Sequence, residues 1–243
     1  MSVLVVTGTD TGVGKTVVTA AVAALAAARG ASVAVVKAAQ TGVGPDEPGD
    51  VDDVGRLAGV TDLHECARFP DALSPAAAAR LTGRQPVNLY EVVGTVRELA
   101  QTRRLVVVEG AGGLLVRFDD EGTTLADLAH TLGAPVLVVA RADLGTLGHT
   151  ALTLEAMAHR GIDLAGVVIG SWPEEPDLAM RCNIRDLETL AARPLAGVLG
   201  AGAGKLHPAE FLVAARAGLA PALGGTFDPG VFRAAHDPAR GER

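Results

Sequence analysis

One stretch near the amino terminus, residues 3–16, constrains the fold of this chain more than any other. Its first four residues are consecutively apolar, which is typical of a strand covered on both faces, and the alanine-rich run 17–28 is typical of the helix that follows. Small residues and Gly14-Lys15-Thr16 lie between them. Small residues let backbone N–H groups close around a polyphosphate, and a helix start adds unpartnered donors with partial positive charge. The stretch therefore predicts a phosphate-binding loop.

The spacing within this loop departs from the common pattern. Five residues separate Gly8 from Gly14, so Thr9 takes the place of the usual first glycine. The end of the loop keeps the pattern, and we expect Lys15 to reach the β- and γ-phosphates and the Thr16 hydroxyl to ligate Mg²⁺. The alternative, an ordinary turn with an exposed lysine, is disfavoured because strand, loop and helix patterns all agree.

Composition favours one domain built on a parallel sheet. The chain has 243 residues, of which 49% are hydrophobic but only 3% aromatic, so Val, Leu, Ile and Ala must build the core. We expect an α/β fold of the P-loop NTPase type, with three layers and helices on both faces of a mostly parallel sheet. A single domain is expected over residues 1–233, followed by a flexible tail over 234–243, where apolar content falls.

Charge and targeting features point to a small-molecule partner in the cytoplasm. The formal net charge is −7 and there is no Lys/Arg run, which argues against nucleic-acid and anionic-membrane partners. No signal peptide or membrane-spanning run is found. Cys66 and Cys182 form no CxxC pattern, and we expect buried or half-buried thiols without chemistry.

A second strand, residues 32–36, is predicted to deliver Lys37 at its carboxyl end, where open α/β sheets place ligands. A loop over 40–49 follows, and a helix is expected to begin at Asp50. Two further carboxylates share this helix start, Asp52 and Asp53. The spacing of the three carboxylates favours a solvated helix start in which they complement the helix dipole. Only the position of the preceding loop at a strand end indicates a metal role as the alternative.

A third apolar strand, residues 105–108, is followed directly by Glu109 and a glycine-rich turn, 110–113. In P-loop proteins an acidic residue at such a strand end holds Mg²⁺ directly or through water, and glycines let the backbone approach a ligand. A solvent-facing loop carboxylate is the alternative, but three glycines in a tight turn argue against it. Glu109 is therefore a predicted site residue.

Further along, helices over 70–103 are expected to cover the sheet, and strands are predicted at 135–140, 164–169 and 195–199. Trp172 follows the second of these strands, where it could equally stack on a base or pack in the fold. Residues 200–205 imitate a phosphate loop but lack the final Ser or Thr, so we do not expect a second loop of that kind there.

Three segments together resemble dethiobiotin synthetase, an enzyme family of biotin synthesis. They are residues 8–16, Lys37 with Gln40-Thr41-Gly42, and residues 108–113 with the sequence Val-Glu-Gly-Ala-Gly-Gly. The resemblance covers roughly residues 1–200. It implies that ATP, Mg²⁺ and CO₂ or bicarbonate close a ureido ring on 7,8-diaminononanoate. A carbamate forms first, the γ-phosphate converts it to a carbamic–phosphoric mixed anhydride, and the second amine displaces phosphate.

The resemblance also implies roles for individual residues. Lys37, Lys15 and Thr11 are the expected catalytic residues, and the expected metal ligands are Thr16, Asp50 and Glu109, with Asp53 as the alternative to Asp50. Residues expected to bind nucleotide are Asp10, Thr11, Gly12, Val13, Gly14, Lys15, Thr16, Val17, Glu109, Gly170, Ser171, Trp172, Gly200 and Ala201. Residues expected to bind the diamine substrate are Thr41, Gly112, Gly113, Leu144, Gly145, Thr146 and Leu147, the last four from the opposite subunit of a homodimer.

One departure from the family bears on nucleotide choice. Gly170-Ser171 stands where many members carry the asparagine that reads adenine, so we expect weak discrimination between bases. Two rival families fit less well. A partition- or septum-type ATPase normally carries a lysine early in the loop, where this chain has Asp10, and a cobyrinate-type amidating enzyme normally adds a glutamine-hydrolysing domain. A non-catalytic nucleotide-binding module is the remaining alternative.

Overall fold

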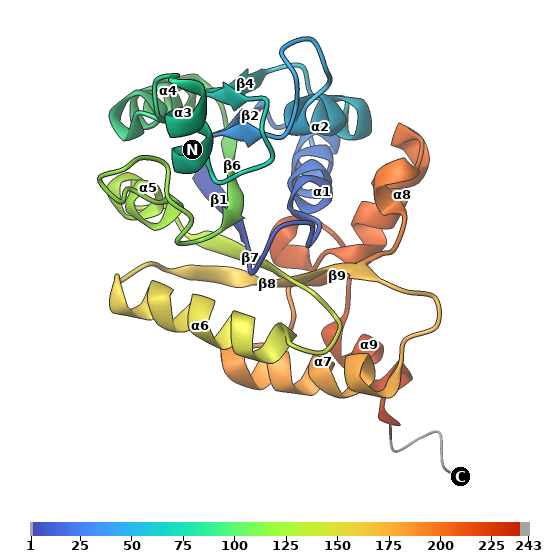
Figure 1. Ribbon diagram of the computed structural model, residues 1–243. Helices are drawn as coiled ribbons and strands as arrows, with labels where there is room; N and C mark the ends of the chain where they lie inside the picture. The colour runs from blue at the N-terminus through green and yellow to red at the C-terminus, as the bar shows by residue number, and fades with distance from the viewer. Residues whose placement is uncertain (1, 239–243) are drawn as a thin grey trace.

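Seven parallel strands form the central sheet of the computed structural model, which describes residues 2–238 (Figure 1). Their order across the sheet is β4-β2-β6-β1-β7-β8-β9. The bounds are β1 Ser2–Gly8, β2 Val33–Lys37, β4 Leu63–Glu65, β6 Leu105–Gly113, β7 Val136–Ala140, β8 Leu164–Trp172 and β9 Gly197–Gly200. Two short strands, β3 Gln40–Thr41 and β5 Arg68–Phe69, pair separately beside the sheet.

Helices cover both faces of this sheet (Figure 1). One face carries α1 Lys15–Ala28, α2 Asp50–Ala58 and α8 Pro208–Gly218. The other carries α3 Pro75–Thr82, α4 Leu89–Thr102, α5 Leu125–Leu132, α6 Thr146–His159, α7 Leu178–Ala191 and α9 Pro229–Ala235. Two short 3-10 turns, η1 Ala203–Lys205 and η2 Pro221–Leu223, complete the described elements.

Alternation along the strands divides the core between the two faces. Leu4 and Val6 of β1 pack towards α1, whereas Val5 packs against the opposite layer. Because both faces are covered, β1 and its neighbours need the continuous apolar runs seen in the sequence. The expected three-layer α/β fold with a parallel sheet is confirmed, and β1 lies at its centre, between β6 and β7.

Several elements were not expected from the sequence, and strand β4 and helix α5 are two of them. Strand β4 is short and carries His64 and Glu65 at the sheet edge, so it shows no apolar run. Helix α5 has only eight residues, and its start is marked by a capping box in which Asp127 accepts hydrogen bonds from the backbone and hydroxyl of Thr124.

The carboxyl-terminal region is ordered farther than expected. Helix α9 runs to Ala235, and the His236 ring packs on Trp172 with its centroid 5.0 Å away. The expected tail over 234–243 thus overlaps a helix at its start, while residues 239–243 lie outside the described part.

The expected burial of the cysteines was wrong, because the free thiols of Cys66 and Cys182 are both exposed. Cys66 follows the edge strand β4, and Cys182 lies on the outward side of α7, whose next two residues face the interior. Among residues 2–238, no helix is both long and apolar enough to span a membrane.

Candidate functional site

The turn between β1 and α1 wraps around its own lysine. Lys15 is buried, and its ammonium donates a hydrogen bond to the backbone oxygen of Asp10 at 2.9 Å. Gly14 has a φ of 98°, and a Cβ there would lie 2.8 Å from the carbonyl oxygen of Gly170. Only glycine combines this backbone conformation with so close an approach, so the loop packs directly on the end of β8.

Charged groups meet where β2 ends beside β6, because Lys37 and Glu109 are directly paired in the register of these strands. Strand β6 continues to Gly113, so Glu109 lies within the strand and not, as expected, in a turn after residue 108. The Lys37 ammonium donates to Glu109 Oε1 at 2.7 Å and to the Gly110 carbonyl at 3.1 Å, and it also forms an ion pair with Asp50 Oδ2. Thr16 Oγ1 donates to the same Glu109 oxygen at 2.9 Å. Four side chains from β2, β6, α1 and α2 therefore meet at one point.

The two lysines differ in their electrostatic surroundings. Burial, assisted by the positive charge of Lys37, lowers the pKa of Lys15. Burial alone would also lower the pKa of Lys37, but the carboxylates of Glu109 and Asp50 outweigh it and raise the pKa. Glu109 and Asp50 therefore favour the charged form of Lys37, whereas the surroundings of Lys15 disfavour its charged form.

These residues open into a cavity of about 620 Å³ at the carboxyl edge of the sheet. Ten of the residues with an expected catalytic, binding or metal role line this cavity: Thr11, Gly12, Gly14, Lys15, Thr16, Val17, Lys37, Thr41, Asp50 and Gly112. Glu109 lies behind this wall, bonded to Thr16 and Lys37. The cavity is large enough for a polyphosphate and a small amine to lie side by side.

The three carboxylates at the start of α2 have different partners. Asp52 accepts a hydrogen bond from the backbone N–H of Gly49 at 2.7 Å, and Asp53 pairs with Arg56 in solvent at 2.7 Å. Asp50 alone among them contacts Lys37. Asp52 therefore caps the helix, as the first reading expects, and Asp50 lines the cavity, while a metal role for Asp50 stays a prediction.

The residues expected near the nucleotide base do not line this cavity. Ser171, Gly200 and Ala201 are exposed, and the Ala201 N–H donates to the Trp172 carbonyl at 2.7 Å. The indole of Trp172 is buried against Phe232 at a centroid distance of 5.1 Å. Of the two sequence alternatives for this tryptophan, the structure therefore shows packing in the fold.

The expected substrate segment 144–147 also lies away from this chain's own cavity. It forms the start of α6, where Gly145 has a φ of 98° and the Leu144 side chain is 86% exposed. Thr146 is buried and donates its hydroxyl to the Arg141 carbonyl at 2.8 Å. Gly113, the remaining expected substrate residue, pairs with Gly8 across β1 and β6.

Some site residues had no assigned role from the sequence. The cavity is also lined by Ala72, Leu73, Ser74 and Pro75, and Ser74 caps α3 there. Arg141 contacts the Asp10 carboxylate at 3.3 Å and the Thr11 carbonyl at 3.2 Å. A site role for Arg141 could have been predicted from its position directly after the apolar strand β7, because the carboxyl ends of parallel strands meet at one edge of the sheet.

Comparison with known proteins agrees with this geometry. A family model described as an AAA domain matches residues 2–201. Proteins named ATP-dependent dethiobiotin synthetase BioD are similar over most of the chain. The one from Frankia casuarinae is 67% identical over 98% of this chain and 100% of its own length, and the one from Streptomyces coelicolor is 59% identical over 98% and 100%. That of Mycolicibacterium vanbaalenii is 52% identical over 87% of this chain and 92% of its own length.

Solved structures support the fold alone. The septum site-determining protein MinD from Pyrococcus horikoshii, complexed with Mg-ADP, superposes with a TM-score of 0.56 at 15% identity, covering 88% of this chain and 92% of that one. The cell division ATPase MinD of Pyrococcus furiosus gives 0.55 at 19% identity, covering 88% and 95%. These identities are too low to carry function, whereas the sequence relatives match almost end to end. The chain belongs to the family of ATP-dependent dethiobiotin synthetases.

Proposed function

We propose that this protein closes the ureido ring of dethiobiotin from 7,8-diaminononanoate, CO₂ and ATP in the cavity of about 620 Å³. The observation that carries the proposal is the meeting of Lys15, Lys37, Thr16, Asp50 and Glu109 at the edge of one cavity. Two ammonium groups and two carboxylates balance one another there, so the site can accept further negative charge only together with cations.

The residues fit the charge changes of the reaction. A carbamate is a poor electrophile until it is phosphorylated, and its oxygen must approach a γ-phosphate that is also negative. Lys15 can hold the β- and γ-phosphates, and Lys37 lines the same cavity as Thr41, near which the carbamate is expected. Lys37 keeps its charge because Glu109 and Asp50 raise its pKa. It can therefore stabilise negative charge throughout the transfer.

The second amine completes the reaction. Its nitrogen attacks the carbamoyl carbon of the mixed anhydride, the C–O bond to phosphate breaks, and the amine loses a proton as the ring closes. Phosphate leaves with both electrons of that bond. Thr11 and Gly112 line the cavity between the loop and the end of β6, where they can hold the reacting groups in place.

Thr16, Asp50 and Glu109 fit a Mg²⁺ ion, because all three offer the oxygen ligands that this ion prefers. Within residues 2–238, no group of three or more His, Cys, Asp or Glu side chains forms a ready metal cage. This agrees with an ion that arrives with the nucleotide and takes most of its ligands from phosphate and water. When bound, Mg²⁺ would neutralise phosphate charge during transfer.

The exposed start of α6 supports a homodimer in which each subunit completes the other's site. Leu144 is exposed although apolar, and Leu115 and Leu152 expose further apolar surface nearby on the same side of the sheet, 46% and 66% exposed. The backbone N–H groups at the start of α6 can bind a carboxylate, as expected for the far end of the diamine substrate.

A mixed-dimer experiment tests this arrangement. Lys37→Ala removes a group from one side of the proposed shared site, and Gly145→Val distorts the start of α6, since the φ of 98° strains any side chain. If the site is shared, an equal mixture of the two inactive proteins regains about a quarter of the wild-type activity, because half the dimers carry one intact site. No recovery in a mixture that demonstrably exchanges subunits contradicts the shared site.

The reaction itself is tested by incubating the protein with diaminononanoate, bicarbonate and ATP and analysing products by mass spectrometry. We expect dethiobiotin and ADP in equal amounts. ATP hydrolysis that proceeds equally well without the diamine would instead identify a nucleotide-binding module or switch.

A further inference from the structure

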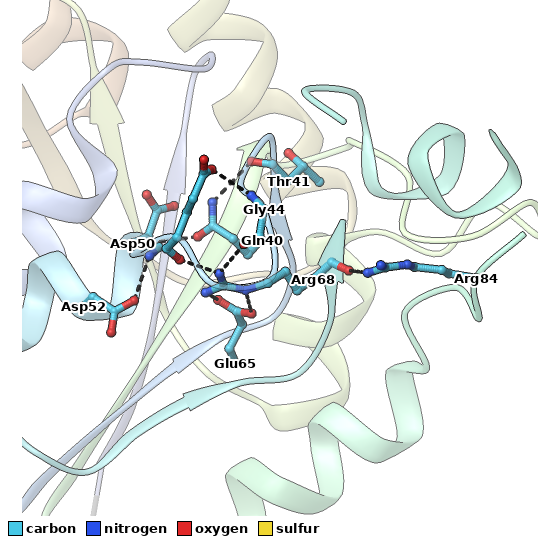
Figure 2. Close-up of polar contacts among 10 residues, drawn as sticks. Gln40, Thr41, Gly44, Asp50, Asp52, Glu65, Arg68 and Arg84 are labelled. Atoms are coloured by element: carbon cyan, nitrogen blue, oxygen red, sulfur yellow. Dashed lines mark hydrogen bonds and ion pairs between the residues drawn. The ribbon is translucent and has the colours of Figure 1, made fainter. Parts of the chain in front are cut away.

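The loop that leads into α2 is held by the side chain of Arg68 (Figure 2). Its guanidinium donates to both carboxylate oxygens of Glu65, at 2.6 and 2.8 Å. Its remaining arm donates to the backbone carbonyls of Gly44 and Glu47, at 2.9 and 2.6 Å. Arg68 therefore ties two points of an irregular loop to the end of an edge strand of the main sheet.

The same network continues to the first residue of α2. Gln40, which pairs with Arg68 across β3 and β5, is buried, and its Oε1 accepts a hydrogen bond from the Asp50 backbone N–H at 2.9 Å. Its Nε2 donates to the Thr41 carbonyl at 3.2 Å. Figure 2 shows these side chains converging from β3, β4 and β5 on the start of the helix. The start of the helix is therefore held by a distant residue, Gln40, in addition to the cap that Asp52 supplies from the helix itself.

Gly49 makes the approach possible. A Cβ at this position would lie 2.9 Å from Arg68 Nη2, 3.0 Å from Gln40 Oε1 and 3.2 Å from Glu65 Oε2. The backbone of Gly49 is extended, with a φ of −103°, so any residue could adopt its conformation. The position needs glycine for space alone, because three polar side chains close over it.

The Arg68–Glu65 pair connects directly to the catalytic cluster through the sheet. Glu65 is the register partner of Lys37 across β4 and β2, and Lys37 is the register partner of Glu109 across β2 and β6. Asp50 reaches Lys37 from the other end of the clamped loop. Lys37 and Glu109 are therefore fixed by the sheet, while the position of Asp50 depends on how the loop before it is held.

We infer that Arg68 is a positioning residue for this reaction: by tying the 44–49 loop to Glu65, it holds Asp50 against Lys37. The consequence for turnover rests on the role proposed above for Asp50, whereas the consequence for loop order does not. The clamp requires an arginine, because four donors in a fixed planar fork serve the carboxylate and two carbonyls at once. A lysine supplies the charge without that geometry.

Hydrogen exchange measures the clamp independently of activity. Arg68→Gln, Arg68→Lys and Gly49→Ala should each speed amide exchange over residues 44–53 by about tenfold or more, since the loop loses its side-chain restraints. The matched control is Arg103→Gln, which breaks a partly buried pair with Asp62 at the opposite end of β4. That variant should leave exchange over 44–53 unchanged. Unchanged exchange in Arg68→Gln would overturn the inference.

A double-mutant cycle then tests whether Arg68 acts through Asp50. The readout is the Mg²⁺ concentration that gives half-maximal turnover at saturating ATP. Arg68→Gln should raise this value by about five- to tenfold in the natural background and have almost no effect in the Asp50→Asn background. Equal effects in both backgrounds would overturn the positioning role.

The two proposals fail in different ways. If Asp50→Asn alone leaves the Mg²⁺ requirement unchanged, the metal role of Asp50 is wrong, and the exchange result by itself decides whether Arg68 holds the loop. Arg103→Gln, which lowers stability without touching this loop, shows how much of any change comes from general destabilisation.

Discussion

Replacing Lys37 with alanine should slow turnover far more than it weakens nucleotide binding. The side chain lies between the expected positions of the carbamate and the γ-phosphate, where negative charge passes during transfer. We expect ATP in its ground state to be held mainly by the loop over residues 8–16, which the substitution leaves intact. An interaction made mostly in the transition state affects the rate more than the affinity.

The magnitude follows from the contacts of the ammonium group. It lies 2.7 Å from Glu109 and is buried, so it is fixed in place before the reaction begins. Removing one such preorganised group lowers turnover by about 10²–10³-fold, equivalent to about 3–4 kcal/mol. The substitution also leaves Glu109 buried without its cation, which should lower the free energy of unfolding by about 3–5 kcal/mol.

Separating these two effects requires a stability control. Val35→Ala removes buried volume from the same strand, β2, away from the cavity, and should cost about 2 kcal/mol of stability with turnover maintained. Single-turnover rates and calorimetric ATP titrations should be measured well below the unfolding temperature of each variant. If Lys37→Ala loses ATP affinity while turnover per bound nucleotide holds, the role assigned to Lys37 is wrong.

Three further predictions concern the Mg²⁺ requirement, the pH dependence of ATP affinity and the choice of nucleotide base. Asp50→Asn and Glu109→Gln should each raise the Mg²⁺ requirement about tenfold, whereas Asp53→Asn should not; a metal titration in which Asp53 is the sensitive position contradicts the assignment. Because burial lowers the pKa of Lys15 below its usual 10.5, ATP affinity should fall as pH rises towards that value, and Lys15→Arg should flatten the profile. Titrations with ATP, GTP, CTP and UTP should agree within about 1–2 kcal/mol, and a thousandfold preference for ATP would refute weak base discrimination.

The central part of the site was predictable because parallel strands end at one edge of a sheet. Lys37 and Glu109 each follow an apolar run, and their register pairing follows from the adjacency of β2 and β6. The loop ending in Lys15 and Thr16 was predictable for a second reason, because all of its residues are consecutive in the sequence. Local sequence therefore identified the groups that we expect to act on phosphate.

The supporting contacts were not predictable, because they join residues without local periodicity. Arg68 and Gln40 come together only because β3 and β5 pair beside the sheet. A strand of two residues has no sequence pattern from which that pairing could be predicted. The sequence left open whether Trp172 stacks on a base or packs in the fold, because its packing partner, Phe232, comes from the distant helix α9. Whether Asp50 or Asp53 contacts Lys37 likewise depended on which face of α2 turns towards that lysine.

The most direct test of the account follows oxygen from CO₂ to phosphate. In a single turnover with freshly added C¹⁸O₂, a carbamate oxygen attacks the γ-phosphate, and the later attack of the second amine breaks the bond between that oxygen and carbon. We expect each released phosphate to carry one ¹⁸O atom and the ureido carbonyl to retain the other. Dethiobiotin formed with unlabelled phosphate would contradict activation of the carbamate by phosphorylation in this site.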